Sequence, residues 1–175
     1  MDVYQTIFEV IDMRSFSNLW YWIALAVVWS TASHFVLGVP FDLILRAKRN
    51  GGQDEVDMHD LVRINVNRIL NIGQVAGLWI TGLGCLVLTM LALLGFVYRA
   101  EFAQALFLLA FPMSLVGILS SRAAASIQAS GAEGDDLYRR LRRHRLYTQA
   151  IGMISILVTA MWGMYKNIAV GPFGY

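Results

Sequence analysis

One titratable side chain, His34, lies inside the long uncharged stretch 18–41 and is the residue best placed to do chemistry. Ionisable groups within a membrane-spanning segment are costly, and for that reason they are functional candidates. A neutral histidine is the least costly of them. Ser30, one helical turn earlier, or Asn71 or Gln74 on the next helix could hold it, so a structural histidine is the first interpretation.

Two other roles for His34 stay open. A small residue four positions before an intramembrane histidine resembles the setting of light-harvesting pigment sites, so a pigment or haem ligand is one alternative. Haem with two axial histidines would need a second histidine in the membrane, whereas His59 and His144 fall outside the uncharged runs. No cofactor is therefore expected, and a purified protein without visible absorbance would exclude this role. A pH-sensitive or pore-lining histidine is the other alternative.

The groups that enzymes and transporters need are missing from the apolar segments. A single cysteine, Cys85, excludes an internal disulfide and an all-cysteine metal site. No carboxylate or lysine stands in any uncharged run, so the usual proton relays and ion-coupling sites are absent. Neither a phosphate-binding glycine loop nor a metal-spaced His/Glu pair occurs. The sequence predicts a protein that is not an enzyme and has no metal site.

Charge segregation predicts the fold. The 175 residues are 57% hydrophobic and 15% charged, against about 45–50% and 25% in globular proteins. About 20 apolar residues cross a bilayer core as a helix, and a spanning chain must satisfy its own backbone hydrogen bonds. We therefore expect an all-α integral membrane protein, a bundle of four transmembrane helices forming one domain over 1–175. The expected spans are 18–41, 69–98, 102–121 and 146–165.

Two of these helices should extend beyond the membrane. No helix breaker stands between Glu55 and Tyr98, and a continuous helix there would be about 65 Å long. The segment "DDLYRRLRRHRLY" likewise runs without a break into the fourth span. The sequence leaves undecided whether the second helix has a hinge at "NIGQ". Residues 1–14 carry apolar side chains on one helical face, which predicts an interfacial helix.

The distribution of basic residues predicts the orientation. Of fourteen lysines and arginines, eleven lie in the segments 42–68 and 122–145. The positive-inside rule places these two segments in the cytoplasm. Both termini are then expected on the periplasmic side of a bacterial inner membrane.

Polar and small residues recur at helical spacing within the spans. Because lipid gives helices little hydrophobic reason to associate, such stripes indicate where helices pack. In the fourth helix the stripe is Thr148, Gly152, Ser155, Thr159 and Gly163. The polar helix-packing face of the first two helices comprises Ser30, His34, Asn67, Asn71, Gln74 and Thr81. A compact bundle explains these residues, and a hydrated vestibule lined by the second helix is the alternative.

The segment "YRRLRRHRLY" has five arginines within seven positions beside the fourth span. They are Arg139, Arg140, Arg142, Arg143 and Arg145. In the first interpretation these arginines fix the topology of the protein in the membrane. In the second they contact anionic lipid head groups, and in the third they contact an acidic protein partner. Nucleic acid is not expected, because positive-inside segments have this composition routinely.

The stretches "FEVIDMRSFSNLWYWIALAVVWSTASHFVLGVPFD", "LVRINVNRIL" and "FAQALFLLAFP" resemble a family of small inner-membrane proteins of alphaproteobacteria of the Rhodobacter and Roseobacter type. Its members are often labelled "component of SufBCD complex". The resemblance implies a bacterial inner-membrane location and an association with iron–sulfur assembly machinery. It carries over no catalytic or binding residue.

Two functional hypotheses follow. The first is a non-enzymatic accessory or scaffold subunit that contacts an integral membrane or cytoplasmic partner, or a second copy. The second is a small homo-oligomeric channel or permease with the polar face of the second helix around the pore. Asn71 and Gln74 discriminate between them: in a scaffold they bond to neighbouring helices, and in a channel they face water.

Overall fold

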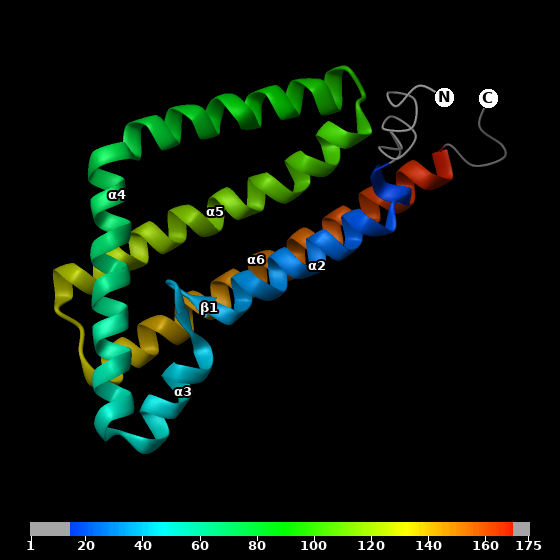
Figure 1. Ribbon diagram of the computed structural model, residues 1–175. Helices are drawn as coiled ribbons and strands as arrows, with labels where there is room; N and C mark the ends of the chain where they lie inside the picture. The colour runs from blue at the N-terminus through cyan, green and yellow to red at the C-terminus, as the bar shows by residue number, and fades with distance from the viewer. Residues whose placement is uncertain (1–14, 170–175) are drawn as a thin grey trace, which may run out of the picture.

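The computed structural model describes residues 15–169, which form a helical protein with one small hairpin (Figure 1). Its elements, in chain order, are the 3₁₀ turn η1 (Ser15–Ser17), α2 (Leu19–His34), β1 (Phe35–Val36), β2 (Val39–Pro40), α3 (Phe41–Asn50), α4 (Gly52–Ala92), the π-helical turn η2 (Leu93–Val97), α5 (Glu101–Ser130) and α6 (Gly134–Ala169). The interfacial helix expected over 1–14 lies outside the described residues.

The helices differ in how closely they associate. Helices α2 and α6 run side by side in opposite directions, and α5 lies next to them (Figure 1). Helix α4 bends sharply near its middle, and its second half extends apart from α2, with α5 between them (Figure 1). Gly73 stands at the midpoint of the 41 residues of α4, and glycine is one of the usual causes of a helix kink. The predicted long helix is therefore present in one piece but is not straight.

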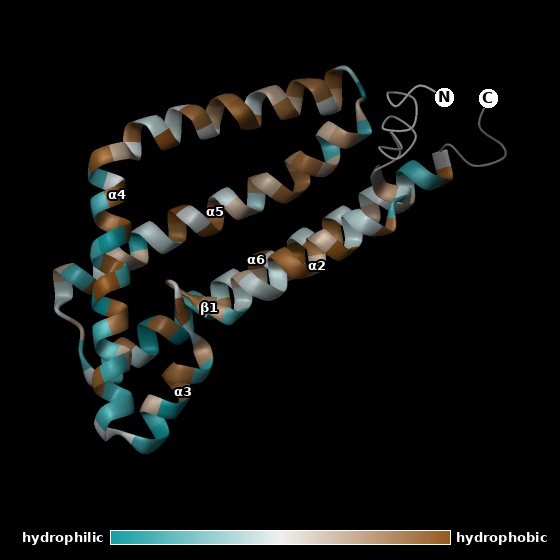
Figure 2. Ribbon diagram, in the orientation of Figure 1, coloured by the Kyte–Doolittle hydropathy of each residue, from teal (hydrophilic) through white to brown (hydrophobic). Residues whose placement is uncertain are grey.

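Three helices are long and apolar enough to cross a membrane: α4 together with η2, then α5, then α6. In Figure 2 these helices are mostly brown and white away from the end where the teal residues gather. This pattern indicates a multi-pass membrane protein in contact with lipid. The expected first span is shorter than predicted, because α2 ends at His34 after 16 residues, roughly 24 Å at 1.5 Å per residue.

A tight hairpin ends α2 early. Strands β1 and β2 pair antiparallel across Leu37 and Gly38, whose φ angles are 52° and 79°. Two positive φ values are what a two-residue type I′ turn requires, and only the glycine adopts one without strain. Leu37 is 4% exposed, so burial of its side chain offsets the strained backbone. Gly38 fits closely: an added Cβ would lie 3.2 Å from the Asn65 side chain of α4.

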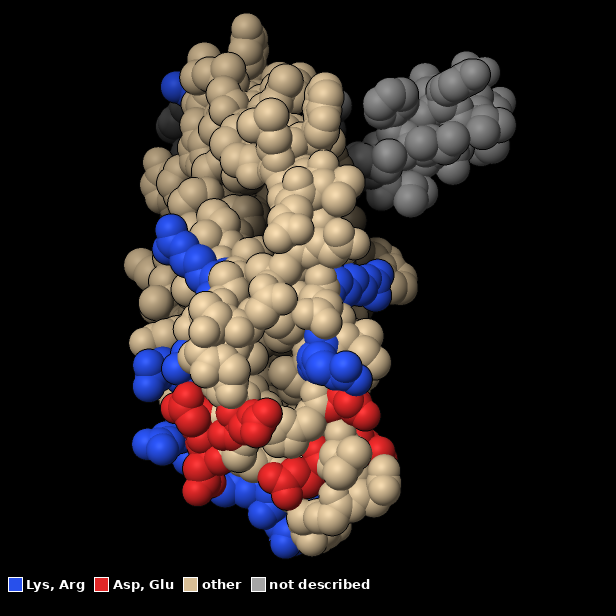
Figure 3. All heavy atoms as spheres, turned by 90° about the vertical axis from the view of Figure 1, so that its left-hand side faces the viewer, with Lys and Arg blue, Asp and Glu red and all other residues tan. Residues whose placement is uncertain are grey.

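The largest apolar core lies at one end of the molecule, which we call the charged end and define as residues 42–68 and 122–145. The hairpin, α3, the first half of α4 and the turn between α5 and α6 meet there around Val39, Met58 and Leu141, all fully buried. Nearly all the Lys, Arg, Asp and Glu visible in Figure 3 gather at this end. Helices α4 and α6 begin in it, at Gly52 and Gly134, ahead of their uncharged runs, as the sequence predicts. The prediction missed α3.

The small-residue stripe predicted on the fourth helix is confirmed as a packing face. Thr148, Ser155 and Thr159 are at most 7% exposed. Gly152 receives the buried indole of Trp29 from α2, so closely that an added Cβ would lie 2.7 Å from Trp29 Cε3. Helix α2 is thus held to α6 by shape complementarity rather than by ion pairs.

Candidate functional site

The polar face predicted on the second helix lies on the outside of the molecule. Asn71, Gln74, Thr81 and Cys85 are all exposed, and Leu78 between them is 87% exposed. Their spacing alternates between three and four residues, which places them on one side of a helix. We call these five residues the outer face of α4. Among the described residues, Asn71 and Gln74 are thus exposed within one chain, and the compact bundle expected around them stays a prediction.

Glycines flank the outer face on both sides. Gly77 and Gly84 border one edge and Gly82 borders the other. A Cβ added at any of the three would meet no atom within 4 Å. Only 6% of the most apolar window of α4 is buried, against 22% in α5 and 28% in α6. The membrane half of α4 therefore offers a polar seam with open room for a close helix–helix approach.

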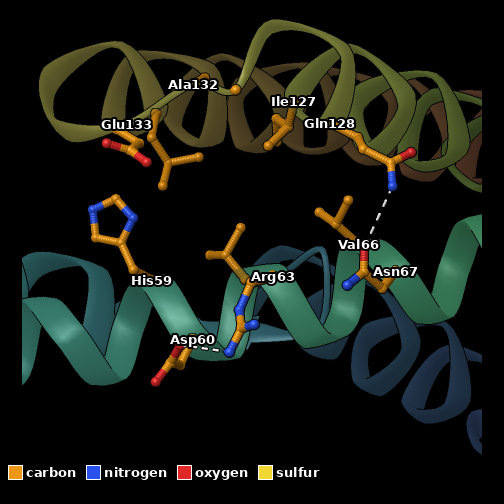
Figure 4. Close-up of a pocket in the computed structure, with 12 residues that line it drawn as sticks. His59, Asp60, Arg63, Val66, Asn67, Ile127, Gln128, Ala132 and Glu133 are labelled. Carbon is orange, nitrogen blue, oxygen red and sulfur yellow. Dashed lines mark hydrogen bonds and ion pairs between the residues drawn. The ribbon is translucent and has the colours of Figure 1, made fainter.

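Asn67 is separated from the outer face and lies at the charged end. It accepts a long hydrogen bond, 3.5 Å, from Gln128 Nε2 of α5. The pair closes one end of a hollow of about 260 Å³ between α4 and the turn from α5 to α6 (Figure 4). His59 and Glu133 face one another across the other end of the hollow (Figure 4).

This hollow has no catalytic constellation. Arg63 bonds to Asp60 of its own helix at 2.9 Å, and the His59 ring lies 3.9 Å from Glu55. Within residues 15–169 no group of three or more His, Cys, Asp or Glu is arranged to hold a metal ion. The arrangement fits a solvated helix surface.

His34 and Ser30 do not join the polar residues of α4. Both are exposed, and the His34 ring packs edge to face on Phe35 with a centroid distance of 5.0 Å. His34 is the last residue of α2. Among the hydrogen bonds of the described residues, none links His34 to Ser30, Asn71 or Gln74.

The structure separates the five arginines by role. Arg145 folds inward: its guanidinium lies 3.6 Å from the centroid of the Phe41 ring and donates to the Ser33 carbonyl at 3.3 Å. It therefore fixes the hairpin to α6. Arg139 and Arg142 are exposed on α6. Arg140 and Arg143 instead lie against α5, beside Arg122.

Three titratable groups at the charged end have shifted pKa values. The hydrogen bond from Arg140 holds the pKa of Asp136 below its usual value. Burial raises the pKa of Tyr138, and the charges of Glu55 and Asp135 add to this effect. Burial lowers the pKa of His144. Asp136 is therefore charged and His144 neutral at neutral pH.

Sequence analysis missed Gln104, a buried amide near the other end of α5. Its Nε2 donates to the Gly95 carbonyl at 2.6 Å, and its Oε1 accepts from the indole of Trp162 at 3.0 Å. The π-helical turn at Leu93–Val97 changes the backbone pairing there, so the Gly95 carbonyl needs a side-chain donor. Gln104 thus joins η2, α5 and α6.

Replacing Gln104 by leucine should destabilise the helical bundle. Two interhelical hydrogen bonds are lost, and in membranes each contributes about 0.6–2 kcal/mol, so we expect a loss of about 1–4 kcal/mol in the free energy of unfolding in mild detergent. Gln128→Leu on the same helix is the control, because the one side-chain hydrogen bond of Gln128 to the described residues is long and exposed. Equal effects of the two substitutions would contradict this role for Gln104.

No protein-family model, curated protein or solved structure matches this chain. The resemblance to the alphaproteobacterial family therefore stays a prediction.

Proposed function

We propose that this protein is a non-enzymatic accessory or scaffold subunit of a bacterial inner-membrane complex, and that the outer face of α4 docks on a helix of another membrane protein. The charged end lies in the cytoplasm, as the positive-inside rule requires, and both termini lie on the periplasmic side.

In this proposal helix α2 also crosses the membrane, as the first of four spans in chain order. Although it is short, it packs along α6 near both of its ends: Ser17 donates to Asn167 at 2.8 Å, and Trp29 fills the space over Gly152. A helix held in this way against a membrane-crossing neighbour shares its depth. The turn η1 and the hairpin lengthen it at either end.

The exposed polar seam of α4 is the observation that carries the proposal. Asn71, Gln74 and Thr81 are exposed on the part of α4 within the uncharged run 69–98, where most of the remaining surface is apolar. Lipid tails neither donate nor accept hydrogen bonds, so these groups are costly in a lipid-facing position. A partner helix with polar side chains would satisfy them. The flanking glycines would let its backbone come close, as small residues do at helix interfaces in membranes.

Gentle purification of the tagged protein from its native membranes, followed by mass spectrometry, tests the proposal. A companion membrane protein in fixed stoichiometry is the expected result. Its identity would supply the function, and iron–sulfur assembly proteins are one group to look for because of the family resemblance. Recovery of the chain alone, as a monomer, would overturn the proposal.

A homo-oligomeric channel is the second candidate, and the same polar seam favours it. Several copies could place Asn71 and Gln74 around a water-filled axis. Flux through liposomes containing the purified protein, lost in Asn71→Leu/Gln74→Leu, would support this candidate. Absence of flux from a well-defined oligomer would exclude it.

A further inference from the structure

A basic groove lies between α5 and α6, at the charged end. Its volume is about 210 Å³, and it is lined by Arg122 and Ser126 of α5 and by Arg140, Arg143, His144 and Tyr147 of α6. No carboxylate is among its lining residues. The groove unites a basic residue of α5 with two of the arginines on α6.

The arginines of the groove are differently engaged. Arg140 donates through Nε to Asp136 at 2.9 Å and through Nη1 to Ser126 Oγ at 2.6 Å, which fixes it across the two helices. In the part of the chain that the structure describes, Arg122 and Arg143 belong to none of the ion pairs. Within the described residues, the groove therefore has two guanidinium groups outside any ion pair beside one that is already fixed in place.

A buried histidine forms part of the groove wall. His144 is 7% exposed, and its Nε2 lies 3.1 Å from Ser120 Oγ. Ser120 Oγ donates to the Val116 carbonyl at 2.8 Å, so it accepts from His144 Nε2. This hydrogen bond joins α5 to α6 beside the arginines of the groove.

The depth of the groove identifies the ligand class. Arg122 is the first charged residue after the uncharged run 102–121, and Arg145 is the last before the run 146–165. The groove thus stands where two membrane helices leave the apolar core, at the level of lipid phosphates. Its other rim carries Leu119 and Tyr147, and Ile118 nearby is half exposed. A ligand with an anionic head and an apolar tail fits this arrangement better than a free anion.

We propose that this groove binds the phosphate group of an anionic phospholipid of the cytoplasmic leaflet, with Arg122 and Arg143 as its principal contacts. Guanidinium groups bind phosphate oxygens in paired hydrogen bonds, and basic pockets between membrane helices on this side are typical lipid sites. The site does not depend on the docking of α4, so either proposal can fail without the other.

Native mass spectrometry of the delipidated protein, with lipids added back, tests the site. Phosphatidylglycerol and cardiolipin should form adducts and raise the melting temperature, while phosphatidylcholine and inorganic phosphate should do neither. Arg122→Gln/Arg143→Gln should weaken the anionic adducts about 30-fold, the equivalent of about 1 kcal/mol per arginine. Arg139→Gln/Arg142→Gln removes the same charge from α6 at residues that do not line the groove, and should change the adducts less than about twofold.

Three results would overturn the proposal. They are equal binding of phosphatidylcholine, an equal effect of inorganic phosphate, and equal losses in the two double variants. The last would indicate a diffuse charge effect rather than a site. Because Arg122 and Arg143 are exposed, we expect the lipid-free melting temperature of their variant to match that of the wild type, which separates lost binding from lost folding.

Discussion

We expect Gly82→Leu/Gly84→Leu to leave the chain folded and to remove it from its complex. A Cβ added at either glycine would meet no atom within 4 Å, so there is open space where the new side chains begin. Leucine also favours the helix by about 1 kcal/mol over glycine. Against a docked partner helix the same side chains are too large, and overpacking of a close contact costs about 1–3 kcal/mol. The companion recovered with the tagged protein should therefore fall by roughly tenfold or more.

Gly117→Leu on α5 is the matched control for this variant. It makes the same substitution at a helical glycine that also has no atom within 4 Å of an added Cβ, but on α5 instead of α4. It should keep both its fold and its companion. If the α4 variant retains its companion at wild-type stoichiometry, the outer face of α4 is not the docking surface. If Gly117→Leu loses the companion as well, the effect does not belong to α4.

Gly152→Leu, unlike the two glycine substitutions on α4, should destroy the fold. Its Cβ alone would lie 2.7 Å from Trp29 Cε3 and 3.2 Å from two further indole atoms. The indole is buried between α2 and α6 and cannot move aside without opening that contact. We expect a loss of about 3 kcal/mol or more, at the upper end of overpacking effects. Thermal unfolding in detergent and accessibility of the α2–α6 contact to protease measure it.

The reciprocal change at Trp29 identifies the cause. Trp29→Ala alone leaves a void over Gly152 and should destabilise the protein by about 3–5 kcal/mol. Combined with Gly152→Leu, it should recover part of the lost stability because the leucine fills the void. Simple addition of the two losses would show that the two residues do not pack on each other.

Much of the fold is readable from the sequence because its signals are local. The runs 69–98, 102–121 and 146–165 fall within the three long apolar helices. The stripe through Gly152 is buried as predicted, since spacing alone places its members on one side of a helix.

What the sequence does not reveal depends on contacts between distant segments. Helix α2 ends at His34 because a tight turn follows, in which Leu37 adopts a positive φ angle. Leucine rarely adopts this conformation, so the sequence does not predict the turn. In the sequence, nothing distinguishes Gln104 from any other polar residue within an apolar run. Its burial is explained only by the π-helical turn η2, whose Gly95 carbonyl accepts its hydrogen bond. The spacing of Asn71 and Gln74 predicts that they share a face, but it carries no information on whether the chain's own helices cover that face.

The central claim, that the outer face of α4 meets another protein within the membrane, can be tested through the native cysteine. Cys85 is exposed on that face and is the only cysteine of the 175 residues, so a photoreactive maleimide attached to it in native membranes reports on its immediate neighbour. Illumination followed by mass spectrometry should yield one dominant adduct with a companion membrane protein, and Gly82→Leu/Gly84→Leu should remove it. Adducts with lipid alone would contradict the claim. Cross-links between copies of the chain itself would favour the homo-oligomeric channel over the accessory subunit.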